Sequence, residues 1–497
     1  MKDVIVLRGA VCAAALLSSS AAIADVTAAD VWADWQKQIQ VYGSENISIG
    51  SEVVDGATLT VNDLSMTMSD EYSSVTTNLG PLVFTENGDG TVSVDVPDSY
   101  LIAVNIEDDL IVDLEVAQEN MAITVSGDPD AMDYDISADS YTMRVAEFKG
   151  DAADVEGDIF VKANDLSGTY QTSADGALAY DMIAENVDVL FDVKEPGGDG
   201  YMLVSGKMER LGADGTMNMP EGLDMDAPDT WFANGFGVDS TMGYLGASFI
   251  ADFSVDGDAG TASIQMGEGG FNATMNQSDL AYGFAFDGVN VSAQMPDLPF
   301  PVSFSWDQAE TSFYMPLEST DEAEPFGFKF ALTEVTVSDD IWNMADPTGT
   351  IPREPVTAEL ELAGMAKLFF NILDPEQAEA MAFADTPGEL NSLQLIGLRL
   401  AAAGAEITGA GDFTFDNSDL ETFDGLPRPT GEVNIGIKGA NALIDKVVEM
   451  GLLPAEQATM GRMFMGMFAT PTGDDELSSK IEINDQGHIM ANGQRIQ

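Results

Sequence analysis

Apolar residues recur along this chain in a ten-residue figure that alternates by two, skips three positions and alternates by two again. The first copy, ATLTVNDLSM at residues 57–66, has Leu59, Val61, Leu64 and Met66 as its apolar positions. Successive side chains of a strand point to opposite faces, so each apolar pair lines one face. The figure therefore predicts two strand segments with an irregularity between them.

The same figure returns at residues 134–143, 180–189, 282–291 and 328–337, with weaker echoes at 159–168 and 433–442. The step of three would turn the second apolar pair to the wrong face, and one extra residue, as in a β-bulge, restores it. The steps hold residues such as Asn62-Asp63 and Asp287-Gly288, several of which tolerate unusual backbone angles. Each copy is predicted to form strand, bulge and strand, with one apolar face and one solvated face.

Two pairs of copies, those starting at Tyr134 and Tyr180 and those starting at Tyr282 and Phe328, are each spaced by 46 residues. A duplicated group of hairpins would give this spacing. A β-rich chain with Asn, Asp and Gly turns also echoes itself without a true repeat, so the sequence leaves both explanations open.

Helical patterns are found near the two ends of the chain. The first covers residues 27–41, where Thr27 can cap the helix and Asp30 occupies the capping-box position. Trp32 and Trp35 in this helix are expected to anchor packing rather than to form a ligand platform. Further helices are predicted at residues 365–373, 375–383, 440–450 and 454–468, the last two as a hairpin.

These patterns predict a mainly β (α+β) fold: curved, mostly antiparallel sheets with repeated bulged strands, one N-terminal helix and a few helices in the C-terminal third. The expected organisation is a signal peptide at 1–24, an N-terminal β-rich half at 25–216, a connector at 217–237 and a C-terminal β-rich half with helices at 238–497. The connector is placed where the strand pattern breaks.

The first 24 residues have the composition of a secretory signal peptide. Lys2 and Arg8 give a weakly positive start, residues 11–17 form a short apolar core, and small residues precede Asp25. The apolar run is too short to span a bilayer, and no later stretch reaches transmembrane length. Cleavage near Ala24 and a periplasmic or secreted location are therefore expected.

The chain is strongly acidic, with 19 Lys and Arg against 85 Asp and Glu and a formal charge of −66. No Lys or Arg lies between Ile39 and Met143, so most carboxylates in that region must be solvated. Disorder is excluded because 45% of the residues are hydrophobic and follow strand patterns. Nucleic acid and anionic lipid head groups are poor partners for such a surface, and an acidic shell suited to saline surroundings is the favoured explanation.

No catalytic, cofactor-binding or metal site is predicted. Cys12, the only cysteine, lies inside the expected signal, which excludes disulfides and thiolate chemistry in the mature chain. His488 is the only histidine and stands beside a glycine in a predicted turn, so it is expected to be a surface turn residue. The usual zinc and copper(II) sites are therefore excluded as well.

Methionine is the one soft metal ligand in supply, at Met460, Met463, Met465 and Met467. Thioethers bind copper(I), but three of these residues share one helix face with Phe464, which is the spacing of a packed apolar stripe. Core or groove lining is favoured over copper. The acidic clusters at residues 224–229 and 256–258 lack the spacing of a calcium loop, whereas a hydrolytic pair of carboxylates needs only to meet in space.

Several longer motifs carry a family resemblance. They are ADVTAADVWADWQ at residues 24–36, ATLTVNDLSMTM at 57–68, RPTGEVNIGIKGANALIDKVVEMGLLPAEQA at 428–458 and HIMANGQRI at 488–496. The chain resembles the domain of unknown function 2125 family (DUF2125), secreted proteins of Gram-negative bacteria, over almost the whole mature chain. The resemblance implies a periplasmic location and no assigned activity, and it transfers no functional residue.

Two functions fit a β-rich chain with long apolar strand faces. Sheets that curl around an incompletely filled interior would bind or carry an apolar envelope component, such as an acyl chain. Sheets with a fully packed core would instead serve a structural or protein-interaction role in the envelope. A carboxylate-dependent hydrolase is a minor alternative, and the chain is expected not to be an enzyme.

Overall fold

A computed structural model describes residues 25–40, 47–69, 72–106, 110–150, 152–174, 176–220, 230–384 and 386–496. The expected signal peptide at residues 1–24 lies outside the described residues. The chain divides into two compact units: unit 1 comprises Met1–Gly270 and Ala293–Pro299, and unit 2 comprises Phe271–Ser292 and Phe300–Gln497. No helix in the described part of the chain is long and apolar enough to cross a membrane.

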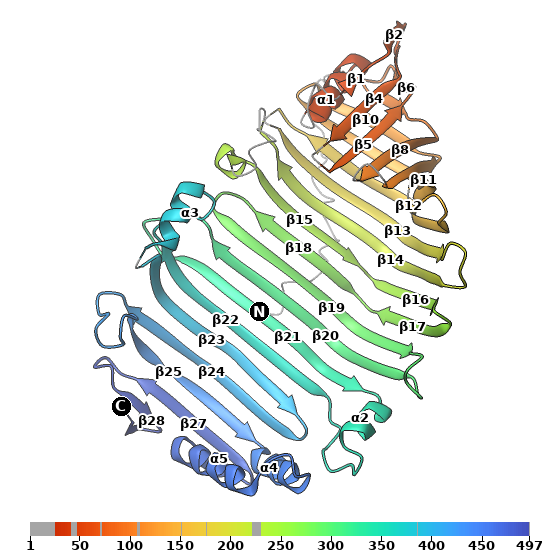
Figure 1. Cartoon of the computed structure of the whole chain (residues 1–497). Coiled ribbons are helices and arrows are strands. Elements are labelled where there is room, and N and C mark those ends of the chain that lie inside the picture. The colour runs from red at the N-terminus through yellow and green to blue at the C-terminus, as the bar shows by residue number, and fades with distance from the viewer. Residues whose placement is uncertain are drawn as a thin grey trace. The chain divides into compact units, whose positions relative to one another are not determined.

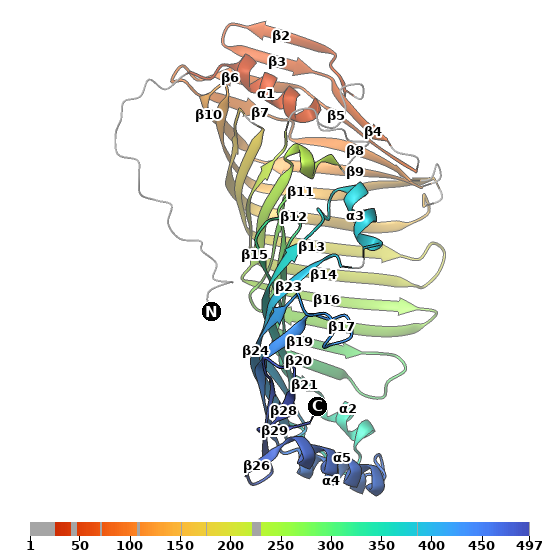
Figure 2. The ribbon, with the colours of Figure 1, turned by 90° about the vertical axis from the view of Figure 1, so that its left-hand side faces the viewer.

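Antiparallel strands dominate both units, and the described α-helices lie near the N-terminus and in the C-terminal third (Figure 1). This arrangement confirms the predicted fold class. The long strands of each unit curve along their length (Figure 2).

Unit 1 contains helix α1 (Ala28–Gln40), the short 3-10 helix η3 (Phe232–Asn234) and a series of strands. The strands are β1 (Ile47–Ser48), β2 (Ser51–Asp55), β3 (Thr58–Asn62), β4 (Leu64–Ser69), β5 (Ser73–Leu79), β6 (Leu82–Glu86), β7 (Val92–Asp95), β8 (Ser99–Ile106), β9 (Leu110–Glu119), β10 (Ala122–Asp128), β11 (Ala131–Gly150), β12 (Glu156–Thr172), β13 (Ala177–Lys194), β14 (Tyr201–Asn218), β15 (Gly237–Tyr244), β16 (Gly246–Val255) and β17 (Asp258–Met266).

Unit 2 contains helices α2 (Asp339–Ala345), α3 (Pro375–Ala382), α4 (Ala440–Glu449) and α5 (Ala455–Phe468). Strand β18 (Gly269–Met275) begins at the end of unit 1. The following strands are β19 (Asp279–Gln294), β20 (Val302–Pro316), β21 (Glu324–Val337), β22 (Val356–Leu368), β23 (Gly388–Ala402), β24 (Ala405–Asp416), β25 (Arg428–Lys438), β26 (Thr470–Gly473), β27 (Glu476–Ile483), β28 (Ile489–Ala491) and β29 (Gln494–Arg495).

Helix α1 begins with the predicted capping box. The Asp30 backbone N–H donates to Thr27 Oγ1 at 3.2 Å, and the Thr27 N–H donates to Asp30 Oδ2 at 3.0 Å. Trp32 is 4% exposed, and the rings of Trp32 and Trp35 lie 5.8 and 5.4 Å from that of Phe84 in β6. Their predicted role as packing anchors is confirmed.

A buried core cluster lies beneath α1 in unit 1. Its buried members are Val26, Ala28, Val31, Trp32, Leu59, Val61, Leu64, Leu82, Phe84, Val92, Val94, Val125, Met132 and Tyr134. Leu59 and Val61 come from β3 and Leu64 from β4, on either side of Asp63, whose φ is 53°. The first copy of the repeated figure therefore forms strand, break and strand with one apolar face. The predicted bulge is absent, because the pairs Ser51–Asn62 and Ser48–Ser65 are three residues apart on both strands.

A line of interrupted pairing crosses the long strands of unit 1. Strands β11 and β12 pair up to Ala138–Leu166 and resume at Ser140–Asn164 with the register unchanged, so the interruption falls at Asp139 and Asp165. The next two strand pairs are interrupted in the same row of the sheet. The predicted bulge is wrong for the copies at 134–143 and 180–189. Each strand and its partner have the same irregularity at the same place, so neither strand has an extra residue.

A left-handed residue stands on every second strand along this line. Asn120, Asp165 and Arg210 have φ of 51°, 50° and 48° and follow one another at intervals of 45 residues. Strands β12 and β14 run in the same direction, so the 45-residue interval corresponds to one strand running up the sheet and the next running down it. The 46-residue spacing between copies of the repeated figure has the same origin. The spacing therefore reflects equal strand lengths, whether or not the hairpins arose by duplication.

Unit 2 contains the bulge that the sequence predicts at 328–337. The pair Leu332–Ala358 is followed by Val335–Val356, so β21 has one residue more than β22 there. Glu334 lies in the extra stretch with φ of 53°, and its backbone N–H donates to Thr357 Oγ1 at 3.1 Å.

One prediction about the C-terminal part is wrong. Residues 365–373 were expected to be helical, but β22 extends to Leu368 because its apolar residues alternate opposite β21 and β23. The predicted connector at 217–237 lies within unit 1, where Asn218 and Gly237 pair directly between β14 and β15. The predicted helices at 375–383, 440–450 and 454–468 are confirmed as α3, α4 and α5.

Candidate functional site

Apolar residues form rows across the long strands of unit 2, each residue paired with the next. The rows are Phe313, Phe328, Leu362, Leu395, Gly411, Val433 and Ile481; Phe330, Leu360, Leu398, Gly409 and Ile435; and Ala309, Leu332, Ala358, Leu400, Ile407, Ile437 and Leu477. Except for Leu395 and Leu398 on β23, members of neighbouring rows are two residues apart on a strand, so they share one face of the sheet. We call this set the unit 2 apolar face.

Strand β23 contains an irregularity that keeps its leucines on this face. Leu395 and Leu398 are three residues apart, whereas their partners on β22, Leu362 and Leu360, are two apart. The register shift between these pairs restores the alternation, as a bulge does. The step of three in the sequence is therefore compensated here by an extra residue.

The alternate rows of the same strands are polar and ion-paired. Arg399 Nε lies 2.8 Å from Glu406 Oε1, and its Nη1 lies 3.6 Å from Glu359 Oε2. Lys480 Nζ lies 2.6 Å from Glu432 Oε2. One face of the sheet is thus apolar and the other charged, as the sequence pattern predicts.

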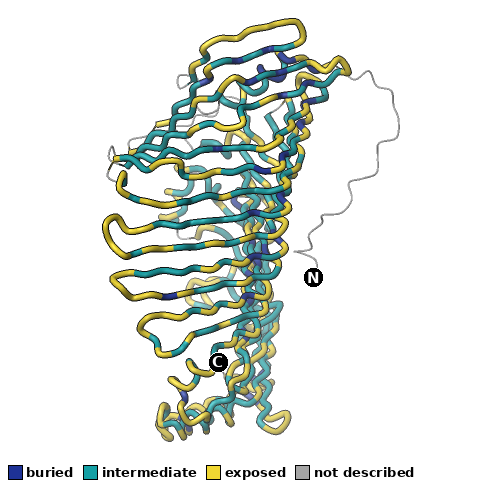
Figure 3. Tube along the Cα trace, turned by 90° about the vertical axis from the view of Figure 1, so that its right-hand side faces the viewer, coloured by how far each residue is buried: buried dark blue, intermediate teal, exposed yellow. Residues whose placement is uncertain are grey.

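No apolar side chain of the unit 2 apolar face is fully buried among the described residues. Phe328, Phe330 and Leu400 are 36%, 38% and 44% exposed, and the other apolar side chains of the face are only half-buried or exposed. Dark blue, which marks buried residues in Figure 3, is sparse along the long strands. Soluble monomers rarely expose a continuous apolar surface of more than a few hundred Å². This face therefore has the properties of a binding surface.

Unit 1 carries a similar set of rows, which we call the unit 1 apolar face. Its two rows are Val116, Met143, Val161, Val189, Gly206, Phe249 and Ile264, and Tyr141, Ala163, Val187, Met208, Ala247 and Met266. A further apolar row lies beyond the interrupted line and consists of Ile123, Ile136, Gly168, Met182, Ala213 and Met242. Met143 and Val161 are 43% and 48% exposed, whereas Val116 and Val187 are buried. The unit 1 apolar face is therefore only partly buried.

Helix α1 lies against the sheet of unit 1 beyond the interrupted line. The Tyr134 hydroxyl donates to Asp34 Oδ2 at 2.6 Å, and the Tyr170 hydroxyl donates to Gln38 Oε1 at 2.9 Å. Burial, with the hydrogen bond to the Asp34 carboxylate, raises the pKa of Tyr134, so this phenol stays protonated. These contacts fix the helix on the sheet and leave the middle strands uncovered.

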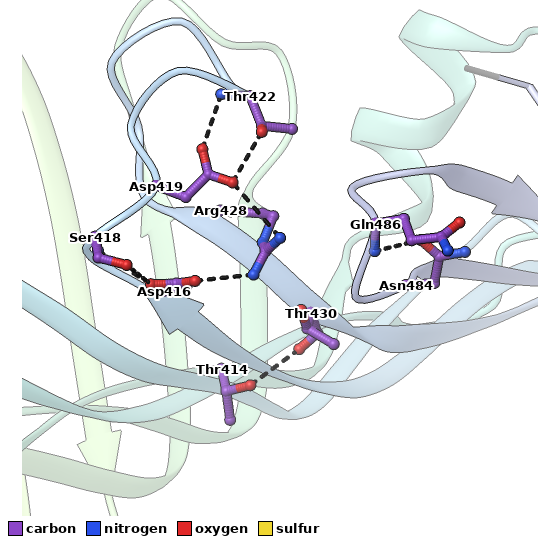
Figure 4. A network of polar contacts seen from close by, with 9 residues as sticks. All are labelled: Thr414, Asp416, Ser418, Asp419, Thr422, Arg428, Thr430, Asn484 and Gln486. Carbon is purple, nitrogen blue, oxygen red and sulfur yellow. Dashed lines mark hydrogen bonds and ion pairs between the residues drawn. The ribbon is translucent and has the colours of Figure 1, made fainter.

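The run at 428–431, which begins one of the motifs of the family resemblance, has a structural role (Figure 4). Arg428 reaches back over the β24–β25 connection, with Nη2 2.8 Å from Asp416 Oδ2 and Nη1 3.5 Å from Asp419 Oδ2. Hydrogen bonds from Ser418 and then the Arg428 charge lower the pKa of Asp416. Gly431 has φ of 155° and stands where a Cβ would lie 2.0 Å from the Asp412 carbonyl oxygen. These residues close a loop rather than form a reactive site.

The residues considered for metal or base chemistry do not converge. His488 lies half-buried beside the β27–β28 turn, as predicted for a turn residue, and its backbone N–H donates to Asn484 Oδ1 at 3.1 Å. Met460, Met463 and Met467 share one face of α5 as predicted. They are 54%, 59% and 60% exposed, so of the two expected places, core or groove lining, the core is wrong. Met465 is half-buried on a different side of the helix.

Carboxylates gather in rows on the polar faces. Burial raises the pKa of Asp214, and the charges of Asp181 and Asp239 raise it further. Burial and then Glu310 raise the pKa of Asp287, while Lys329 Nζ lies 2.6 Å from Glu310 Oε2.

These rows and the predicted acidic clusters do not make a metal site in the described residues. No group of three or more His, Cys, Asp or Glu in the described part of the chain could hold a metal ion. Residues 224–229 lie outside the described residues, whereas residues 256–257 form the turn between β16 and β17 and Asp258 begins β17. The uncovered apolar faces, which motif searching alone does not locate, are the candidate site.

A comparison with protein-family models matches residues 240–489 to a family described as an uncharacterized protein conserved in bacteria, DUF2125. The match spans 489 − 240 + 1 = 250 of the 497 residues. The chain belongs to the DUF2125 family. The match begins in β15 and ends in β28, so it includes the unit 2 apolar face and helices α4 and α5 but not α1. The family resemblance was expected over almost the whole mature chain, and the match supports it over residues 240–489.

Searches of curated proteins and of solved structures find no match to the chain. The function of this DUF2125 protein therefore has to be argued from its own faces and charges.

Proposed function

We propose that this DUF2125 protein is a non-enzymatic periplasmic protein that binds or carries an apolar component of the cell envelope, held through its acyl chains. The observation that carries the proposal is the unit 2 apolar face, on which no apolar side chain is fully buried among the described residues. Two of its rows cross the seven strands β20, β21, β22, β23, β24, β25 and β27. At about 4.8 Å per strand, six gaps make each of these two rows about 29 Å long.

Acyl chains suit this face energetically. Each buried methylene group contributes about 0.8 kcal/mol, so ten of them contribute about 8 kcal/mol before the cost of association is subtracted. The face offers aliphatic and Phe side chains without a charged group among them, and such a lining binds apolar ligands with little directional demand. The ion-paired polar face would meanwhile keep the loaded protein in solution.

The periplasmic location rests on the sequence. The basic start, the short apolar core and the small residues before Asp25 support a cleaved signal, and the absence of cysteine after Cys12 is compatible with an oxidising compartment. N-terminal sequencing of protein from the native host should return Asp25 as the first residue. A protein that begins at Met1 in the cytoplasmic fraction would refute the location.

The binding test compares two double substitutions on neighbouring, oppositely facing pairs of β22 and β23. Leu362→Glu with Leu395→Glu places two carboxylates on the apolar face, and Ala363→Glu with Gln394→Glu places two on the polar face. Fluorescent fatty acid should bind the first variant at least about tenfold more weakly, equivalent to about 1.4 kcal/mol, and the second as it binds the unmodified chain.

Equal affinity in the two variants, or no binding by the unmodified chain, would overturn the proposal. Both variants should keep the circular dichroism spectrum of the unmodified chain, which separates lost binding from lost folding. The alternative, a structural role with a fully packed core, has support only around α1, where Phe84 and Val61 are completely buried.

A further inference from the structure

Helix α5 carries an apolar stripe on its exposed side. Met460, Met463, Phe464 and Met467 are 54%, 59%, 51% and 60% exposed. They follow the spacing i, i+3, i+4, i+7, which places them on one face of a helix. In most surface helices such a stripe packs against the core, so its exposure needs an explanation.

The opposite side of α5 is the side that packs. Ala458 at its start and Ala469 just after its end are 4% and 7% exposed. Arg462 Nη2 donates to the Asn441 carbonyl oxygen at 3.2 Å and to Asp445 Oδ1 at 2.5 Å, which ties α5 to the neighbouring α4 (Figure 1). These contacts fix the rotation of the helix, so the Met and Phe side chains cannot turn inward while they hold.

This stripe lies in an unusually neutral part of an acidic protein. No Asp or Glu occurs between Glu456 and Asp474, whereas the whole chain has a formal charge of −66. The one basic residue in that interval, Arg462, is paired with Asp445. Leu452, in the connection that leads from α4 to α5, is 69% exposed as well.

A second copy of the chain is a poor occupant for this face. Helix α5 has 14 residues and is therefore about 21 Å long. A stripe of four side chains along that length falls short of the roughly 800 Å² per partner of a stable interface. Two chains of −66 would also repel each other on approach.

We propose that the exposed face of α5 docks on the surface of a zwitterionic lipid bilayer. A lipid surface needs only a few apolar side chains to enter between its head groups, and a helix with one apolar face lies in the interfacial plane. The near-neutral interval avoids the repulsion that an anionic surface would exert on the rest of the chain. The helix is too short to cross the bilayer, so docking leaves the protein peripheral.

Docking goes beyond the proposed function, because it requires no transfer of an acyl chain to either apolar face. A protein that carries lipids would gain from it, since docking holds the chain beside a source or an acceptor of its ligand. Each activity can fail while the other holds, and the two tests measure different events.

Flotation with phosphatidylcholine vesicles tests the proposal on the full chain. The double variant Met463→Glu with Met467→Glu should float at least about tenfold less than the unmodified chain, because each buried carboxylate costs more than the apolar group it replaces. The control Val53→Glu with Val54→Glu adds the same charge at side chains that are 51% and 74% exposed on β2, and it should float normally.

A fluorescent dye attached to α5 measures directly whether the helix inserts into the bilayer. In a Cys12→Ser background, which is free of cysteine, Phe464→Cys and Val54→Cys each accept one environment-sensitive fluorophore. Vesicles should shift the emission of the dye at position 464 to shorter wavelength and leave that at position 54 unchanged. Equal flotation of the two double variants, no flotation of the unmodified chain, or a dimer that the α5 variant dissociates would each overturn the proposal.

Discussion

The region under α1 in unit 1 and the middle of the sheet in unit 2 share one sequence pattern and differ in what covers it. In the first, Val61 and Phe84 alternate on strands and are completely buried beneath Trp32 and Trp35. In the second, Phe328 and Phe330 alternate in the same way and remain more than a third exposed. Alternation therefore specifies that a face is apolar, while a separate element decides whether the face becomes core or surface.

The largest expected effect contrasts one phenylalanine from each region. Phe84→Ala should destabilise unit 1 by about 3–5 kcal/mol, because it empties a fully enclosed site, whereas Phe330→Ala should cost unit 2 about 1 kcal/mol. Urea unfolding followed by peptide-resolved hydrogen exchange reads the two units separately. Equal losses would mean that the unit 2 apolar face is covered in solution.

The interrupted line of unit 1 gives the next effect. Asp165→Val places a β-branched residue at φ of 50° and should cost about 1–2 kcal/mol, while Asp165→Gly relieves the same backbone and should be neutral or slightly stabilising. Glu185→Val is the matched control, since it lies in the same row on the next strand and is not among the residues with positive φ.

Thermal midpoints of the three variants measure this difference. If Asp165→Val and Glu185→Val lower the thermal midpoint by the same amount, the left-handed conformation of Asp165 is not the cause of the interrupted strand pairing.

The smallest effect concerns the charged face. The folded-state pKa of Asp214 is raised, so the folded chain binds more protons than the unfolded chain as the pH falls through that value. This residue therefore weakens stability at neutral pH, and the loss is relieved on acidification. Asp214→Asn should be more stable than the unmodified chain at pH 7, with the advantage shrinking toward acid pH.

The control for this prediction is Asp135→Asn, because Asp135 is paired with Thr169 rather than with a carboxylate. Urea midpoints measured at several pH values compare the two variants. An advantage of Asp214→Asn that grows on acidification would reverse the sign of the argument.

Local patterns predicted much of this fold. Alternation located the strands, Thr27 and Asp30 located the start of α1, and the step of three located the irregular positions. The form of the irregularity at Asp139 was missed, because it depends on whether the partner strand carries the same step, which is a property of the pairing.

The candidate site was harder to predict because exposure is a tertiary property. The α5 methionines have the spacing of a core stripe, and only the packing of Arg462 and Ala458 on the other side of the helix turns them outward. In the same way, nothing in the alternation of β22 and β23 says whether another layer covers Leu362 and Leu395. The DUF2125 match adds a family over this part of the chain without adding an activity.

The central claim is that the uncovered apolar faces hold acyl chains, and native mass spectrometry of detergent-free protein from its own host tests it most directly. The account predicts a stoichiometric adduct that organic solvent removes and that contains acyl chains, with less adduct on the Leu362→Glu, Leu395→Glu variant than on the polar-face control. A ligand-free mass for the unmodified protein, together with no uptake of added fluorescent fatty acid, would contradict it.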